Sequence, residues 1–130
     1  MSWTPLYHAF LVGCGGFVGS VLRYVLSGAV QRLDPVGAFP YGTLAVNAVG
    51  CLVIGVLGGL ADSRHLFGPE LRHLIFLGVL GGLTTFSTFG HETLALIRDG
   101  EHLKAGANII ASIVVCLVLT WLGYEFGRTR

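Results

Sequence analysis

Four long apolar stretches alternate with short polar segments along this chain. No Lys, Arg, Asp or Glu occurs within residues 1–22, 35–61, 74–90 or 105–124. A helix needs about 20 mostly apolar residues to cross the hydrocarbon core of a bilayer. The pattern therefore predicts an all-α integral membrane protein with one domain, residues 1–130, and four transmembrane helices at about 5–26, 41–60, 74–97 and 105–126.

The third apolar stretch contains a glycine pair, Gly81 and Gly82, followed by a threonine pair, Thr84 and Thr85. Glycine inside a helix costs about 0.5–1 kcal/mol relative to alanine, and threonine hydroxyls compete for backbone hydrogen bonds. In a membrane, a helix break is tolerated only where protein or a polar cavity surrounds it. We expect this helix to break near Gly81–Thr84 and restart. A continuous helix whose small residues allow close packing fits the spacing equally well.

Isolated polar residues within the spans indicate either contacts between helices or a water-lined path. Thr43 and Asn47 are four residues apart and share a helix face, and a buried amide needs a hydrogen-bonding partner. Asn47 therefore either bonds another helix or lines water. Arg23 near the end of the first span either snorkels to the interface or faces an aqueous vestibule. The fourth span carries a weakly polar stripe at Asn108, Ser112, Cys116 and Thr120.

Composition supports the membrane assignment and removes several functional classes. The chain is 53% hydrophobic and 12% charged, about half the usual charge of a soluble domain, with a net charge of +1. No basic patch suggests nucleic acid, and no catalytic constellation suggests an enzyme. The three cysteines lie singly in different spans, so each is expected to be a small apolar residue. The first span lacks a basic leading region and is expected to be retained, with Trp3 and Tyr7 at the interface.

The basic residues are shared equally between the two sides of the predicted membrane topology. Arg64, Arg72, Arg128 and Arg130 fall on the side of the N-terminus, and Arg23, Arg32, Arg98 and Lys104 fall on the other. Lys and Arg in short loops normally set the orientation, so this chain has no preferred one. We therefore expect it to insert both ways and to assemble as an antiparallel, dual-topology homodimer, which supplies by assembly the inverted symmetry of larger transporters.

Three segments together closely resemble the Fluc/CrcB family of fluoride channels. They are GGFVGSVLRY (Gly15–Tyr24), YGTLAVNAVG (Tyr41–Gly50) and GGLTTFSTFGHE (Gly81–Glu92). The resemblance covers essentially all four spans. It implies a dual-topology homodimer in the cell (inner) membrane, with two pathways for passive fluoride export and a structural sodium ion at the dimer centre.

The resemblance also implies roles for individual residues. Phe86 and Phe89 match paired pore phenylalanines, and Asn47 matches a pore asparagine. Polar lining is expected from Thr43, Ser112, Thr85 and Ser87, a vestibule from Arg23 and Glu92, and backbone carbonyls for sodium from Gly81 and Thr84. Two departures concern the fourth span, where Asn108 stands in place of a frequent tyrosine and Cys116 in place of a common serine.

The residue chemistry agrees with an anion pathway without specifying fluoride. Neutral donors can replace hydration water without trapping the ion, and phenyl ring edges carry partial positive charge. Two alternatives stay open. A small four-helix, dual-topology multidrug exporter would need a carboxylate at a span centre, where this chain has none, and a non-transporting assembly subunit would leave Asn47 and the hydroxyl run unexplained.

Overall fold

The structure, a computed structural model, describes residues 4–34, 36–64 and 66–130. Four helical segments are long and apolar enough to cross a membrane: α1 (Thr4–Gln31), α2 (Tyr41–Arg64), a third segment over Pro69–Arg98, and α6 (His102–Arg128). The described residues contain no strand. This confirms the all-α fold and the four predicted spans. The interfacial position expected for Trp3 lies outside the described residues.

The helices extend beyond the predicted spans, because helical winding continues through the polar residues that flank each apolar core. The extension matters most for α1, which ends at Gln31 and not near Leu26. Arg23 is therefore well inside the helix. A positive-φ glycine, Gly100 at φ 78°, forms the tight turn between the third segment and α6.

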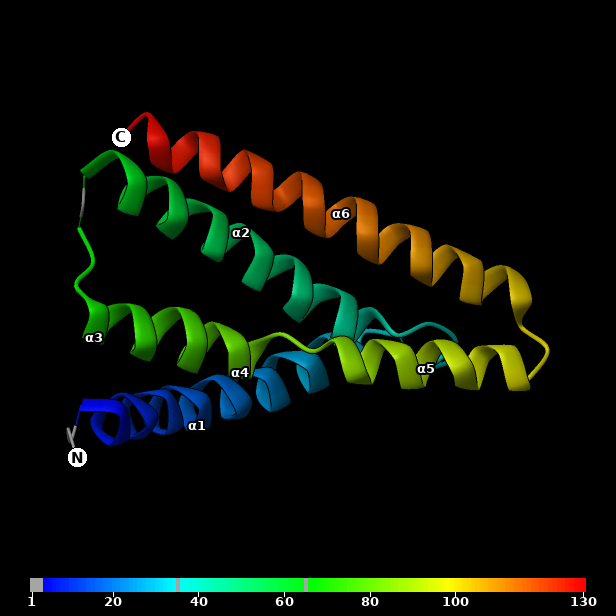
Figure 1. Cartoon of the computed structure of the whole chain (residues 1–130). Helices are drawn as coiled ribbons and strands as arrows, with labels where there is room; N and C mark the ends of the chain where they lie inside the picture. The colour runs from blue at the N-terminus through cyan, green and yellow to red at the C-terminus, as the bar shows by residue number, and fades with distance from the viewer. Residues whose placement is uncertain (1–3, 35, 65) are drawn as a thin grey trace.

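The four segments form two parallel pairs that lie side by side (Figure 1). α1 packs against the first half of the third segment, and α2 packs against α6. The start of α1 and the end of α6 lie at the same end of the molecule, as four alternating spans require. Each pair is therefore formed by spans that run in the same direction.

Glycines set the close approach within the α2–α6 pair. A Cβ atom at Gly55 would collide with the backbone carbonyl of Thr120, and one at Gly59 with that of Tyr124. On α6, a Cβ atom at Gly123 would likewise collide with the backbone carbonyl of Leu52. Helix backbones can touch this closely only where side chains are absent, which is the usual role of small residues in membrane helix packing. The contacts fix a parallel register between the two helices.

The α1 pair is built in the same way. A Cβ at Gly15 would strike the carbonyl of Leu74, and one at Gly19 would strike that of Val79. Gly82 in turn faces the Gly16 carbonyl. Of the two glycines that suggested a broken helix, Gly82 is thus also a packing residue, whereas Gly81 meets no neighbouring helix. The alternative of a continuous helix is wrong, because Thr84 and Thr85 are extended.

The third segment is irregular along much of its length. It begins with the short α3 (Pro69–Arg72), continues as a π-helix, η1 (His73–Leu80), and ends its first half with α4 (Gly81–Leu83). Thr84 and Thr85 are extended, with ψ of 155° and 120°, and α5 (Phe86–Arg98) follows. The predicted break is confirmed, at the far end of the expected interval. The π-helix has no counterpart in the prediction.

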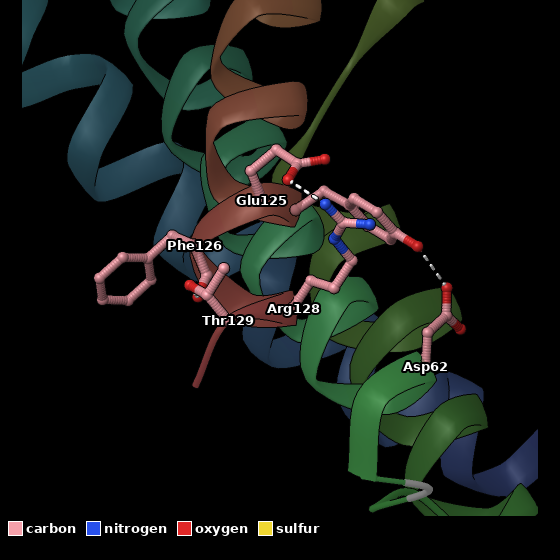
Figure 2. Close-up of polar contacts among 6 residues, drawn as sticks. Asp62, Glu125, Phe126, Arg128 and Thr129 are labelled. Atoms are coloured by element: carbon pink, nitrogen blue, oxygen red, sulfur yellow. Dashed lines mark hydrogen bonds and ion pairs between the residues drawn. The ribbon is translucent and has the colours of Figure 1, made fainter.

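The remaining packing is light. A small core of Val46, Leu80 and Leu83 lies where the pairs meet, and much of the rest of the apolar surface is exposed, as a bilayer-facing surface would be. At one membrane edge the Tyr124 hydroxyl donates to Asp62 at 2.9 Å, and Arg128 pairs with Glu125 at 2.7 Å (Figure 2). The bond from Tyr124 to Asp62 ties the ends of α2 and α6 together, whereas the pair of Arg128 and Glu125 lies within α6.

A glycine substitution tests the packing of α2 on α6. Gly55→Ala places its Cβ against the Thr120 backbone, whereas Gly58→Ala meets only a Tyr124 ring atom at 3.8 Å. Overpacking of this kind costs roughly 1–3 kcal/mol. We expect Gly55→Ala to lower the thermal unfolding midpoint in detergent and Gly58→Ala to leave it close to the parent value. Equal midpoints for the two variants would show that the helices do not approach as closely as described.

Candidate functional site

The helix break is held by one side chain from a neighbouring span. The amide of Asn47, on α2, donates from Nδ2 to the Thr85 carbonyl at 3.0 Å and accepts from the Thr85 N–H at 2.7 Å. Thr85 is only 8% exposed, so both of its backbone groups would otherwise be buried without partners. Of the two roles expected for Asn47, the contact between helices is therefore observed directly.

This pairing also changes which donors the backbone carbonyls before the break receive. In a continuous helix the Thr85 N–H would bond the carbonyl of Gly81, but here it bonds Asn47. The Thr84 N–H and Thr84 Oγ1 both donate to the Leu80 carbonyl, at 3.0 and 2.9 Å. The Gly81 carbonyl is thus released from its helical donor at the C-terminal, electronegative end of α4.

Thr85 also starts the next helix. Its Oγ1 accepts from the Thr88 N–H at 3.2 Å, which is an N-cap contact for α5. The same oxygen lies 3.0 Å from Thr88 Oγ1 and 3.2 Å from Ser87 Oγ. The electropositive N-terminus of α5, with its unpaired first-turn N–H groups, therefore begins within a cluster of neutral hydroxyls.

A cavity of about 460 Å³ opens beside the break, between α2, the third segment and α6. It contains many of the predicted site residues together: Asn47, Gly81, Thr84, Thr85, Phe86, Phe89 and Ser112. Its remaining wall is largely aliphatic and aromatic. Residues from three separate parts of the sequence, Asn47, residues 81–89 and Ser112, thus share one space.

The two phenylalanines lie together at this cavity but differ in burial. Their ring centroids are 5.3 Å apart with the planes tilted by 47°. Phe89 is 9% exposed, whereas Phe86 is 81% exposed. The pair therefore extends from the interior of the protomer to its apolar outer surface.

Ser112 connects the cavity to a buried polar chain between α5 and α6. Its hydroxyl lies 3.5 Å from Asn108 Oδ1, and Asn108 Nδ2 donates to Thr93 Oγ1 at 2.9 Å. Thr93 in turn donates to the Phe89 carbonyl at 2.7 Å. Asn108 is 2% exposed, so its side-chain amide links α6 to α5 inside the protein. Sequence reasoning missed Thr93, whose position one turn after Phe89 was the available signal.

A second, more polar cavity of about 520 Å³ lies between α1, α2 and the start of α5. Arg23, Thr43, Thr85 and Thr88 line it, with Ser20, Ser27 and Gln31. Arg23 is half-buried at this cavity, which favours the vestibule reading over a lipid-facing, snorkelling side chain. Thr85 borders both cavities.

Glu92 lies close to the polar cavity without being among the residues that line it. Thr43 Oγ1 donates to Glu92 Oε1 at 2.8 Å, while Glu92 Oε2 is buried with no partner among the described residues. Thr43 is in the first turn of α2, so this contact is near a membrane edge. Ser87 is exposed and reaches the site through its contact with Thr85.

Comparison with known proteins assigns the chain to a family. The profile of "CrcB-like protein, Camphor Resistance (CrcB)" matches residues 10–124. The chain belongs to the CrcB-like family. It is 51% identical over 123 residues to the "Fluoride-specific ion channel FluC" of Methylobacillus flagellatus, covering 95% of this chain and 96% of that protein. A protein of the same name from Geotalea daltonii is 49% identical over 118 residues, covering 90% of this chain and 94% of that protein. One from Shewanella amazonensis is 44% identical over 123 residues, covering 95% of this chain and 98% of that protein.

The match to the CrcB-like family spans both helix pairs, the break and both cavities. The oxygen ligands available at the break suit a hard cation, since backbone carbonyls and hydroxyls are the ligands such ions prefer. No group of three or more His, Cys, Asp or Glu residues occurs together in the described part of the chain. The oxygen ligands at the break of this CrcB-like protein thus fit an alkali or alkaline-earth ion better than a transition metal.

The clasp between Asn47 and Thr85 can be tested by truncation. Asn47→Ala leaves a buried N–H and a buried carbonyl without partners, and each unsatisfied group costs roughly 1–3 kcal/mol. Ser112→Ala, at the same cavity, removes only a long 3.5 Å contact and is the matched control. We expect a clearly lower thermal unfolding midpoint for Asn47→Ala and a small change for Ser112→Ala. A stability loss no larger than that of the control would remove Asn47 as the support of the break.

Proposed function

We propose that this CrcB-like protein is a fluoride-selective channel that lets fluoride leave the cell passively and so lowers its toxicity. The choice of ion rests on the relatives, which carry the name of fluoride-specific channels at 44–51% identity over nearly the whole chain. The passage itself is supported by one observation of the structure: a polar and an apolar cavity meet at Thr85.

The path begins in the polar cavity, which Arg23 and Thr43 line and where the positive charge of Arg23 raises the local concentration of anions. A half-buried cation at the entrance attracts an anion without binding it along the rest of the path. From there the ion passes the hydroxyl cluster of Thr85, Ser87 and Thr88, whose O–H groups replace water as donors. The first-turn N–H groups of α5 add a positive helix end.

Beyond Thr85 the ion enters the apolar cavity, between Asn47, the phenylalanine pair and Ser112. Asn47 uses one amide N–H to hold Thr85 and keeps a second for the ion. The rings of Phe86 and Phe89 offer their electropositive edges. All of these groups are neutral, so they can substitute for hydration water and still release fluoride.

We further propose that two copies assemble in antiparallel orientation in the inner membrane. Phe86 is largely exposed and Gly81 is exposed, so a single protomer leaves the Phe86 ring and the backbone at Gly81 on its outer surface. A second copy would cover both. The equal distribution of basic residues permits both orientations, and an isologous two-fold contact is the simplest closed assembly.

A structural sodium ion at the centre of this dimer would use the carbonyls of Gly81 and Thr84. Their fit is supported by the diversion of the Thr85 N–H to Asn47, which leaves the Gly81 carbonyl without its helical donor. Such an ion would contribute positive potential to a neutral passage. The residues of this chain would hold it through oxygen atoms that face the exposed side of the break.

Fluoride and chloride efflux from proteoliposomes tests the proposed function. The parent protein should release fluoride quickly and chloride at the rate of empty liposomes. Phe86→Ile and Phe89→Ile should abolish or sharply reduce the efflux, because isoleucine keeps apolar bulk and removes the ring quadrupole. Asn47→Asp should be lower still, since an ionised carboxylate repels the anion and cannot donate.

Efflux must be counted per folded dimer, with size-exclusion chromatography run in parallel. If the phenylalanines served only for packing, their replacement would reduce the amount of dimer and leave the rate per dimer normal. Stable isoleucine variants that conduct at the parent rate would exclude the rings from the path. Parent protein that releases chloride as readily as fluoride would reject the assignment of fluoride.

The sodium proposal makes a separate prediction about coupling. Sodium in the buffer should raise the thermal unfolding midpoint and support fluoride efflux when it is equal on both sides of the membrane. Potassium or N-methylglucamine at the same concentration is the control. A fluoride flux that required a sodium gradient, with one sodium ion moved per anion, would contradict a structural ion.

A further inference from the structure

Two cysteines from different spans lie in the wall of the apolar cavity beside the helix break. Cys51 of α2 and Cys116 of α6 both line it. The glycine contacts explain why. Gly55 lies against Thr120 and Gly59 against Tyr124, and the same parallel register, continued by one turn, places Cys51 opposite Cys116. The pair is therefore a product of the close glycine contact between α2 and α6.

The surroundings of the two thiols restrict what they can bind. Both side chains are partly accessible, and no third His, Cys, Asp or Glu joins them among the described residues. A structural zinc ion takes four ligands and would not be satisfied here. Thiolates select soft ions, and a univalent ion of this kind accepts two sulfur ligands in a line.

We propose that Cys51 and Cys116 form a binding site for a soft univalent metal ion, copper(I) or silver(I), held between the two thiolates. Binding replaces both S–H protons, which pass to solvent, and needs no oxidant. The site shares the apolar cavity with Asn47, Phe86 and Phe89. An ion bound there blocks the fluoride path, a consequence that rests on the proposed function.

Silver nitrate in chloride-free buffer is the probe for binding. The background is Cys14→Ala, because Cys14 is exposed on α1 and would bind silver independently of the pair. Equilibrium dialysis with metal analysis should give one silver ion per protomer. Adding Cys51→Ala or Cys116→Ser should weaken binding at least about tenfold, since one thiolate then remains. Two silver ions per protomer, or unchanged affinity in both double variants, would overturn the site.

Fluoride efflux separates this inference from the proposed function. Silver should inhibit efflux from liposomes that contain the Cys14→Ala protein and should inhibit the Cys14→Ala, Cys51→Ala protein at least about tenfold less effectively, in line with its lower affinity. Silver bound at one ion per protomer with undiminished efflux would support the site and overturn the block. A protein that conducts no fluoride in any form would overturn the proposed function, while the dialysis result would still decide the metal site.

Discussion

The double hydrogen bond between the Asn47 amide and the backbone of Thr85 is the interaction on which the rest of the site depends. Extended backbone inside a bilayer is tolerated only if its polar groups find partners within the protein. The amide satisfies an N–H and a carbonyl at once, at 2.7 and 3.0 Å. The third span can therefore end one helix and begin another within the membrane.

Several features of the site follow from that bond. The Thr85 N–H is withdrawn from the Gly81 carbonyl, so a ligand oxygen becomes available at the end of α4. The Thr85 hydroxyl is free to cap α5, which directs a positive helix end toward the hydroxyl cluster. Thr85 lines both cavities, so the two cavities adjoin at this residue.

Glycine contacts between parallel helices position the partners of this bond. Close approach of α2 to α6 aligns their polar and thiol side chains along one register, and close approach of α1 to the third segment brings Arg23 to the polar cavity. Because these contacts are between backbones, they leave little freedom for sliding or rotation. The two cavities are the spaces that remain where the pairs face each other and side chains do not fill the gap.

Much of this protein could be predicted from the sequence, because a bilayer imposes a simple requirement on composition. Charge-free stretches of suitable length identify the four spans, and the Gly–Gly–Leu–Thr–Thr run identifies the break, within a few residues. Many of the motif residues also line one cavity. Their partners could not be predicted. Nothing in the spacing shows that Asn47 bonds Thr85, that Thr43 bonds Glu92 or that Asn108 bonds Thr93. Nor does it show that Cys51 and Cys116, which lie singly in two different spans, line the same cavity. Each of these depends on how two helices are rotated and shifted against each other, which backbone packing at glycines decides and local sequence does not record.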